Sequence, residues 1–174
     1  IDTDRFFQAL ALKPGISVVD LGCGPGDYSI PIANIVGREG RVYAIDLWAG
    51  CIEFLKSEMK RLEIGNIVPI LTDMRKHLPF ESGSIDVCLM ATILHDLKED
   101  HSHNATLSEV KRVLKKDGTF AIVEFAKRDG PPGPPITIRL SREETAMLVE
   151  PHGFIRKGAY DLGPYTYMML YSSS

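Results

Sequence analysis

The chain has 174 residues, the usual size of one domain, and can bury a large hydrophobic core without disulfides or metal. Its 44% hydrophobic and 25% charged residues exclude an intrinsically disordered protein. A formal net charge of -3 argues against a protein that binds nucleic acid along the phosphate backbone. No stretch is apolar over the roughly 18 residues that a membrane span needs.

Three cysteines are present, Cys23, Cys51 and Cys88, and no two of them stand at the C-x-x-C spacing. The odd number and the spacing argue against a disulfide scaffold and against a structural zinc site. We therefore expect a cytoplasmic protein without a bound metal.

Helical and strand-like patterns alternate through the first half of the chain. A Pro14-Gly15 pair ends the first helical segment. Pro31 stands in the first turn of the second, where its missing N–H is tolerated. The pattern predicts helices over residues 4–12, 28–36 and 52–62, and strands over residues 16–21, 41–45 and 67–71.

The second half continues the alternation and ends differently. Residues 85–93 are apolar on both faces, as in a central parallel strand. A helix over residues 107–114 is followed by Asp117-Gly118, and a strand over residues 119–125 by a loop rich in Gly and Pro. Ser141 and Glu144 form a capping-box pattern for a helix to Val149. Two strands, over residues 154–160 and 165–171, then close the chain.

This order predicts an α/β fold, with a doubly wound, mainly parallel sheet of seven strands covered by helices on both faces. The last two strands are joined by too few residues for a parallel crossover, so they are expected to pair antiparallel. No repeat or second domain is visible, and residues 1–174 are expected to form a single domain.

A glycine-rich turn follows the first predicted strand. Gly22, Gly24 and Gly26 are spaced by two, which permits a tight turn and close approach of a ligand to the backbone. The dinucleotide pattern G-x-G-x-x-G fails, because Asp27 stands at its third glycine. Carboxylates at Asp20 and Asp27 would repel a pyrophosphate, so a ligand with a cationic end is favoured. The phosphate-binding pattern G-x-x-x-x-G-K-[ST] is absent.

Acidic residues also end the next two strands. Asp46 follows the glycines by about 20 residues, where a carboxylate accepts ribose hydroxyls in doubly wound sheets. Asp73 ends the third strand, where it can accept from an exocyclic amine while Met74 packs on a purine. Two structural alternatives stay open: Asp46 as a helix cap and Asp73 as a turn cap.

These features together resemble the class I S-adenosylmethionine-dependent methyltransferases. The resemblance rests on the segment from Asp20 to Gly26, on Asp46, on Asp73 with Met74, and on the closing strand pair. The order of segments is most similar to the small methyltransferases of the ubiquinone/menaquinone-biosynthesis type, with methyltransferase domains 11 and 25 as models. It implies S-adenosyl-L-methionine as cofactor and a small molecule as methyl acceptor.

The resemblance also implies roles for single residues. The glycine turn would pass under the methionine part of the cofactor, and Asp20 would face its amino group. Asp46 would hold the ribose hydroxyls, and residues 73–74 would meet the adenine edge. The positions expected to contact the cofactor are Asp20, Gly22, Cys23, Gly24, Gly26, Asp46, Leu47, Asp73, Met74 and Ala91.

Methyl transfer from a sulfonium mainly requires alignment of the acceptor, and a base is needed only when the acceptor must lose a proton. The candidates for catalysis are His95, Asp96 and Tyr28. Each also has a structural alternative, such as a core or loop histidine or a helix cap. No Asn/Asp-Pro-Pro-Tyr sequence follows the fourth strand, which argues against methylation of nucleic-acid bases or glutamine amides.

Several alternatives remain open at this point. The chain could bind the cofactor as a regulatory or assembly protein, methylate RNA or a metalloid, or act as a nicotinamide-dependent oxidoreductase. A homodimer could complete the acceptor side. The loop over residues 128–135 is expected to overhang the site, with Ile136, Ile138 and Leu140 near an apolar pocket.

Overall fold

The computed structural model describes residues 1–174. Its helices are α1 (Thr3–Leu10), α2 (Ser29–Val36), α3 (Ala49–Arg61), α4 (Leu94–Glu99), α5 (His103–Val113) and α6 (Arg142–Val149), followed by a short 3-10 helix, η1 (Glu150–His152). Its strands are β1 (Ser17–Leu21), β2 (Arg41–Asp46), β3 (Ile67–Leu71), β4 (Ile85–Ala91), β5 (Leu114–Phe125), β6 (Phe154–Asp161) and β7 (Thr166–Ser173).

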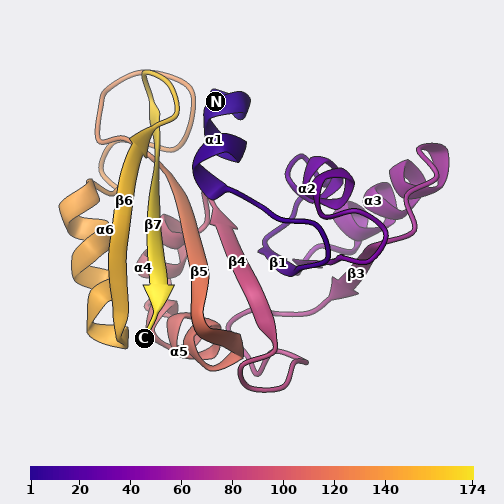
Figure 1. The fold of residues 1–174 in the computed structure, drawn as a ribbon. Helices are drawn as coiled ribbons and strands as arrows, with labels where there is room; N and C mark the ends of the chain where they lie inside the picture. Colours follow the sequence, from indigo (N-terminus) through magenta and orange to yellow (C-terminus); the bar gives the residue numbers. More distant parts are fainter.

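All seven strands form one sheet in the order β3-β2-β1-β4-β5-β7-β6 (Figure 1). Strands β1 to β5 pair in parallel, whereas β7 lies antiparallel between β5 and β6. The predicted fold class and the antiparallel closing pair are therefore confirmed. Because parallel strands end at the same edge, the segments that follow β1 to β5 meet along one edge of the sheet.

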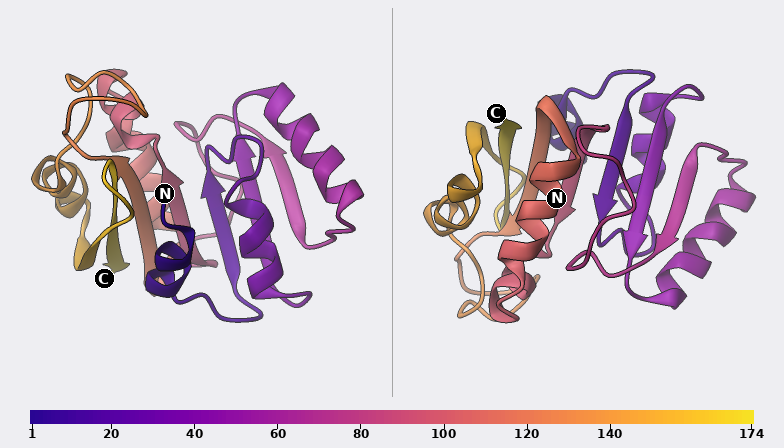
Figure 2. Two further views of the ribbon diagram at one scale, coloured as in Figure 1. Left: turned by 90° about the horizontal axis from the view of Figure 1, so that it is seen from above. Right: turned by 90° about the horizontal axis from the view of Figure 1, so that it is seen from below.

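Helices cover both faces of this sheet (Figure 2). Each face has its own hydrophobic core. Apolar residues of α1, α2 and α3 pack on one face, and those of α4, α5 and α6 pack on the other. Strand β1 shows the alternation, since Val18 belongs to the first core and Val19 to the second. The core strands are buried on both sides, which explains their continuous apolar sequence.

The end of β4 differs from the prediction. The strand stops at Ala91 rather than at residue 93, because Thr92 adopts a left-handed backbone with φ of 58°. Helix α4 follows at once and was not predicted, since the apolar run continues through Ile93 and Leu94 and hides the boundary. His95 consequently lies in a helix rather than in a loop.

The junction of α5 and β5 also differs. Helix α5 begins at His103 instead of residue 107, and β5 begins at Leu114 instead of residue 119. Asp117 has a φ of 62°, and the pairing of β4 with β5 shifts register near Ile85. The predicted stop at Asp117-Gly118 is thus an irregularity inside a strand, because tertiary pairing with β4 continues on both sides of it.

The side chain of Arg139 makes several hydrogen bonds to the segment after β5. Arg139 is buried, and its guanidinium donates to the carbonyl oxygens of Ala126, Arg128, Gly130, Pro132 and Pro134. The capping box of α6 is confirmed, with Ser141 and Glu144 bonded reciprocally. Leu140 is fully buried in the core, so this expected pocket residue does not face the surface.

None of the helices combines the length and the apolar character that a bilayer crossing requires.

Candidate functional site

The glycine turn between β1 and α2 adopts a backbone that favours glycine. Gly22, Gly24 and Gly26 have φ values of 74°, 53° and 99°. A Cβ on Gly26 would lie 2.6 Å from a methyl carbon of Leu55, and one on Gly22 would lie 2.7 Å from Cδ1 of Ile93. The turn therefore needs glycine for its conformation and, at two positions, for space.

Asp20 lies near the end of β1, beneath this turn, and is 1% exposed. The Ser29 hydroxyl donates to its Oδ2 at 2.6 Å, whereas Oδ1 is buried without a hydrogen-bond partner. Burial, together with the charges of Asp46 and Asp27, raises the pKa of Asp20 to about 6. A buried carboxylate oxygen without a donor is a favourable place for a ligand ammonium group.

Asp46 ends β2 and connects the two loops that follow neighbouring strands. Its Oδ2 accepts from the backbone N–H of Gly24, and its Oδ1 accepts from that of Trp48, each at 2.8 Å. Each carboxylate oxygen can accept a second hydrogen bond, so two hydroxyl groups can still be held here. Asp46 is not the helix cap itself, because the cap position of α3 is Trp48.

Asp73 follows β3 and shapes its own turn. Its Oδ1 accepts from the backbone N–H of Arg75 at 3.0 Å and from Nε of the same residue at 2.8 Å. The hydrogen bond and charge of Arg75 hold the pKa of Asp73 below its usual value. The turn-cap alternative is thus realised, and Asp73 remains ionised beside the cleft described next.

A cleft of about 230 Å³ opens at the carboxyl edge of the sheet and gathers residues from the ends of several strands. Among the predicted site residues, Gly22, Asp46, Leu47, Asp73, Met74 and Asp96 line it. Residues that were not predicted also line it, namely Arg75, Ile93, Leu97 and Asp100. The exposed Trp48 ring completes the rim.

The other predicted residues do not line this cleft, and these include Asp20, Gly24 and Gly26. Cys23 and Ala91 are buried behind it, and burial raises the pKa of the Cys23 thiol above its usual range. Tyr28 packs with its ring centroid 4.9 Å from that of Phe6, and burial raises its pKa as well. Tyr28 therefore does not line this cleft, and its role in catalysis stays a prediction.

His95 is buried at the start of α4, beside the cleft residue Asp96. Its Nδ1 lies 2.8 Å from Oε2 of Glu124, a fully buried carboxylate in β5. Sequence reasoning missed Glu124, although one signal was present. A charged residue inside the apolar run AIVEF is almost never buried without a partner.

These donor and acceptor groups suit a ligand with a cationic end and hydroxyl groups. The orphaned oxygen of Asp20 fits an ammonium group, and Asp46 fits a pair of hydroxyls. A pyrophosphate would meet carboxylates instead of donors. The residues present therefore fit S-adenosylmethionine better than a nicotinamide dinucleotide.

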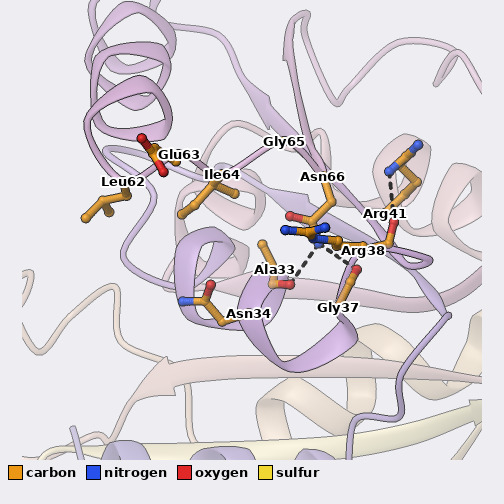
Figure 3. A pocket seen from close by; sticks show the side chains of 10 residues that line it. All are labelled: Ala33, Asn34, Gly37, Arg38, Arg41, Leu62, Glu63, Ile64, Gly65 and Asn66. Carbon is orange, nitrogen blue, oxygen red and sulfur yellow. Dashed lines mark hydrogen bonds between the residues drawn. The ribbon is translucent and has the colours of Figure 1, made fainter.

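A second hollow, of about 490 Å³, lies elsewhere (Figure 3). It opens between the C-terminal ends of α2 and α3, at the amino edge of the sheet. The Asn66 amide crosses it and donates to the carbonyls of Ala33 and Gly37, each at 2.8 Å. This hollow lies where α2 and α3 end and connect to the strands that follow them.

The chain is similar to known methyltransferases in sequence and in structure. Residues 12–150 match the family model described as methyltransferase domain. A demethylmenaquinone methyltransferase from Lactococcus lactis is 34% identical over 110 residues, which are 63% of this chain and 42% of that protein. A 2-phytyl-1,4-naphtoquinone methyltransferase from Trichormus variabilis is 32% identical over 126 residues, or 70% of this chain and 54% of that protein.

Among solved structures, a SAM-dependent methyltransferase from Aquifex aeolicus superposes with a TM-score of 0.90 at 26% identity, covering 99% of this chain and 90% of that one. The chain spans about half the length of the curated relatives it matches.

Proposed function

Since the chain belongs to the class I S-adenosylmethionine-dependent methyltransferases, we propose that it transfers a methyl group to a small aromatic acceptor of the quinone type. The reactive form would be the reduced ring, a hydroquinone, because the acceptor carbon must supply an electron pair. The cofactor supplies a methyl group that is already activated by a positive sulfur.

The observation that carries the proposal is the arrangement of carboxylates along one edge of the sheet. Asp20 lies near the end of β1, Asp46 ends β2, and Asp73 follows β3, so that all three belong to the same edge of the sheet. Their order supports contacts to the amino group, the ribose and the adenine of the cofactor, respectively. The cofactor roles expected for Gly22, Cys23, Gly24, Gly26, Leu47, Met74 and Ala91 belong to the same proposal.

The acceptor class is supported by the relatives. Their names describe demethylmenaquinone and phytyl-naphthoquinone as substrates of those proteins. The segment that Arg139 organises follows β5 and so begins at the same edge of the sheet as the cleft, and its Ile136 side chain is exposed there. A flat aromatic ring buries apolar surface there at roughly 25 cal/mol per Å².

The chemistry would need few side chains. Holding the ring carbon in line with the methyl group supplies the largest share of the rate enhancement. Nε2 of His95 would accept a proton from the acceptor hydroxyl, which makes the ring carbon a better nucleophile. Asp96, which lines the cleft beside it, would orient the acceptor. The ring carbon would gain the methyl group that the cofactor supplies, the ring hydrogen would leave as a proton, and the acceptor oxygen would regain a proton.

The experiment is a labelled-methyl assay of the purified chain with reduced and oxidised naphthoquinones and benzoquinones. We expect label in an extractable product only with the reduced rings, together with one S-adenosylhomocysteine per methyl group. A protein that binds S-adenosylhomocysteine by calorimetry yet labels no acceptor would instead support the regulatory alternative.

We further propose that residues 1–174 act as one catalytic domain, since all strands belong to one sheet. A cytoplasmic location is supported by the three cysteines, which form no disulfide. A homodimer that completes the acceptor side is part of the same proposal, and light scattering that reports a monomer at assay concentration would remove it.

A further inference from the structure

A buried carboxylate, Glu124, holds one end of the His95 ring. Its Oε2 lies 2.8 Å from Nδ1 of His95, and its Oε1 accepts from the His95 backbone N–H at 3.1 Å. The backbone N–H of Phe125 also donates to Oε2, at 3.2 Å. Glu124 is 0% exposed, and His95 is its only ion-pair partner.

The other end of the ring lies beside Asp96, a residue of the cleft, whereas His95 itself is buried and does not line the cleft. Nε2 of His95 lies 3.5 Å from Oδ1 of Asp96, whose side chain is 64% exposed and lines the cleft. Because a carboxylate accepts but does not donate, Glu124 places the proton of the neutral ring on Nδ1. Nε2 is then the nitrogen with the free lone pair.

The buried Glu124 carboxylate lowers the stability of the fold, so packing alone does not explain its presence. Burying a carboxylate without an arginine or lysine beside it is unfavourable, and an apolar residue in β5 would pack without this penalty. Phe125 contacts the ring edge-on, with centroids 6.2 Å apart, so the imidazole has little freedom to turn. A buried histidine–carboxylate pair that ends at a cleft is typical of a base held in one tautomer.

We propose that Glu124 is a positioning residue that holds Nε2 of His95 toward the acceptor and stabilises the protonated ring. This inference rests on the proposed methyl transfer. In the step, the acceptor O–H proton moves to Nε2, the ring becomes an imidazolium, and Nδ1–H continues to donate to the Glu124 carboxylate. The proton leaves to solvent after the product dissociates.

The charged neighbours of the ring are few and can be tested separately. Glu124 faces it from β5, and Asp96 and Glu99 face it from α4. Tyr167 faces Glu124 from β7: burial and the charge of Glu124 raise the pKa of Tyr167, and its hydroxyl is hydrogen-bonded to Thr145 and to the carbonyls of Leu140 and Ser141. Burial alone lowers the pKa of His95, but the hydrogen bond and charge of Glu124 outweigh it, and the pKa lies above its usual value.

The first test follows the imidazole signals of the ligand-free protein by NMR from about pH 5 to about pH 9, a range that spans histidine titration. His95→Gln assigns the signal. In Glu124→Gln we expect the pKa of His95 to fall by roughly one unit or more. Glu99→Gln is the matched control, since it removes the same charge from an exposed position, and a much smaller change is expected.

An unchanged pKa and tautomer of His95 in a folded Glu124→Gln protein would overturn the inference. If that variant does not fold, the nitrogen shifts of the wild-type ring decide, because a neutral ring protonated on Nε2 contradicts the assignment. Glu124→Asp keeps the charge, so its His95 should titrate nearer to the wild type than that of Glu124→Gln.

The second test uses the methyl-transfer assay. In Glu124→Gln we expect the acid limb of the kcat profile to move to lower pH and kcat to fall roughly 10-fold or more, since one pKa unit is a factor of ten. KM should stay unchanged. If the pKa of His95 falls in Glu124→Gln as expected but no methyl group is transferred, only the proposed function is refuted. If methyl groups are transferred but the pKa of His95 is the same in Glu124→Gln and the wild type, only the role of Glu124 is refuted.

Discussion

The Ser29 hydroxyl donates a 2.6 Å hydrogen bond to Oδ2 of Asp20, so that these two residues join the first strand to the helix after the glycine turn. The bond satisfies one carboxylate oxygen and leaves the buried Oδ1 without a partner. Ser29 therefore fixes the position of the Asp20 carboxylate, and only one of its two oxygens has a hydrogen-bond donor in the ligand-free protein.

Replacing Asp20 by asparagine should stabilise the ligand-free protein and weaken cofactor binding. The pKa of Asp20 is raised from 3.8 to about 6 in the folded protein, so folding takes up a proton when the pH lies between these two pKa values. Stability therefore falls as pH rises through this window, and the penalty at neutral pH is about 3 kcal/mol. Urea denaturation of Asp20→Asn should show a gain of this order near neutral pH and almost none near pH 4.

S-adenosylhomocysteine should bind Asp20→Asn more weakly by calorimetry, because the charge that faces its amino group is lost. Asp27→Asn is the control, since Asp27 is exposed beside the same turn. A variant that gains no stability at neutral pH would show that Asp20 titrates normally in the folded chain.

Substitution of Asp46 should reduce cofactor affinity most. Asp46→Ala removes hydrogen bonds from a charged acceptor and should cost roughly 1.5–3 kcal/mol, about 10- to 100-fold in Kd. The variant also frees the N–H groups of Gly24 and Trp48, which loosens both loops. Calorimetry with S-adenosylhomocysteine measures the change, and unchanged affinity would refute the ribose role of Asp46.

Asp100→Asn provides the comparison for Asp46, because Asp100 lines the same cleft with an exposed side chain. Its effect on affinity should stay small, since exposed charges interact weakly through water.

Alanine at Gly26 should destabilise the protein more than alanine at Gly15. Both positions have positive φ, 99° and 81°, so both changes carry backbone strain of about 1–2 kcal/mol. Only at Gly26 does the new Cβ meet a buried side chain, Leu55 at 2.6 Å, which adds about 1–3 kcal/mol. Urea denaturation gives the difference, and equal losses would mean that Leu55 moves away freely.

Arg139→Lys should loosen the segment after β5 without unfolding the core. Lysine has three donors on one nitrogen and cannot reproduce the fork that serves five carbonyls. Amide hydrogen exchange should rise over residues 126–140 in the variant. Arg142→Lys, which alters a partly exposed ion pair nearby, should leave that exchange unchanged; protection that persists in Arg139→Lys would contradict this account.

Parts of the candidate site that depend on local sequence could be predicted, whereas contacts between residues far apart in the chain could not. Asp46 and Asp73 were predictable because each lies at or just after the end of a recognisable strand, and parallel strands end together. The pairing of His95 with Glu124 was not, since it joins residues 29 positions apart. Helix α4 was also missed, because its apolar residues continue those of β4 without a turn signal.

The sequence alone determined the order of the strands and of the helices other than α4, the glycine turn and the acidic residues at the strand ends. These features arise from periodicity and backbone preferences that act over a few residues. Only the tertiary structure decided that Tyr28 packs on Phe6, that Leu140 is buried, and that Glu124 holds His95. Such contacts depend on how the helices pack on the sheet, and this packing is set by the free energy of the whole folded chain.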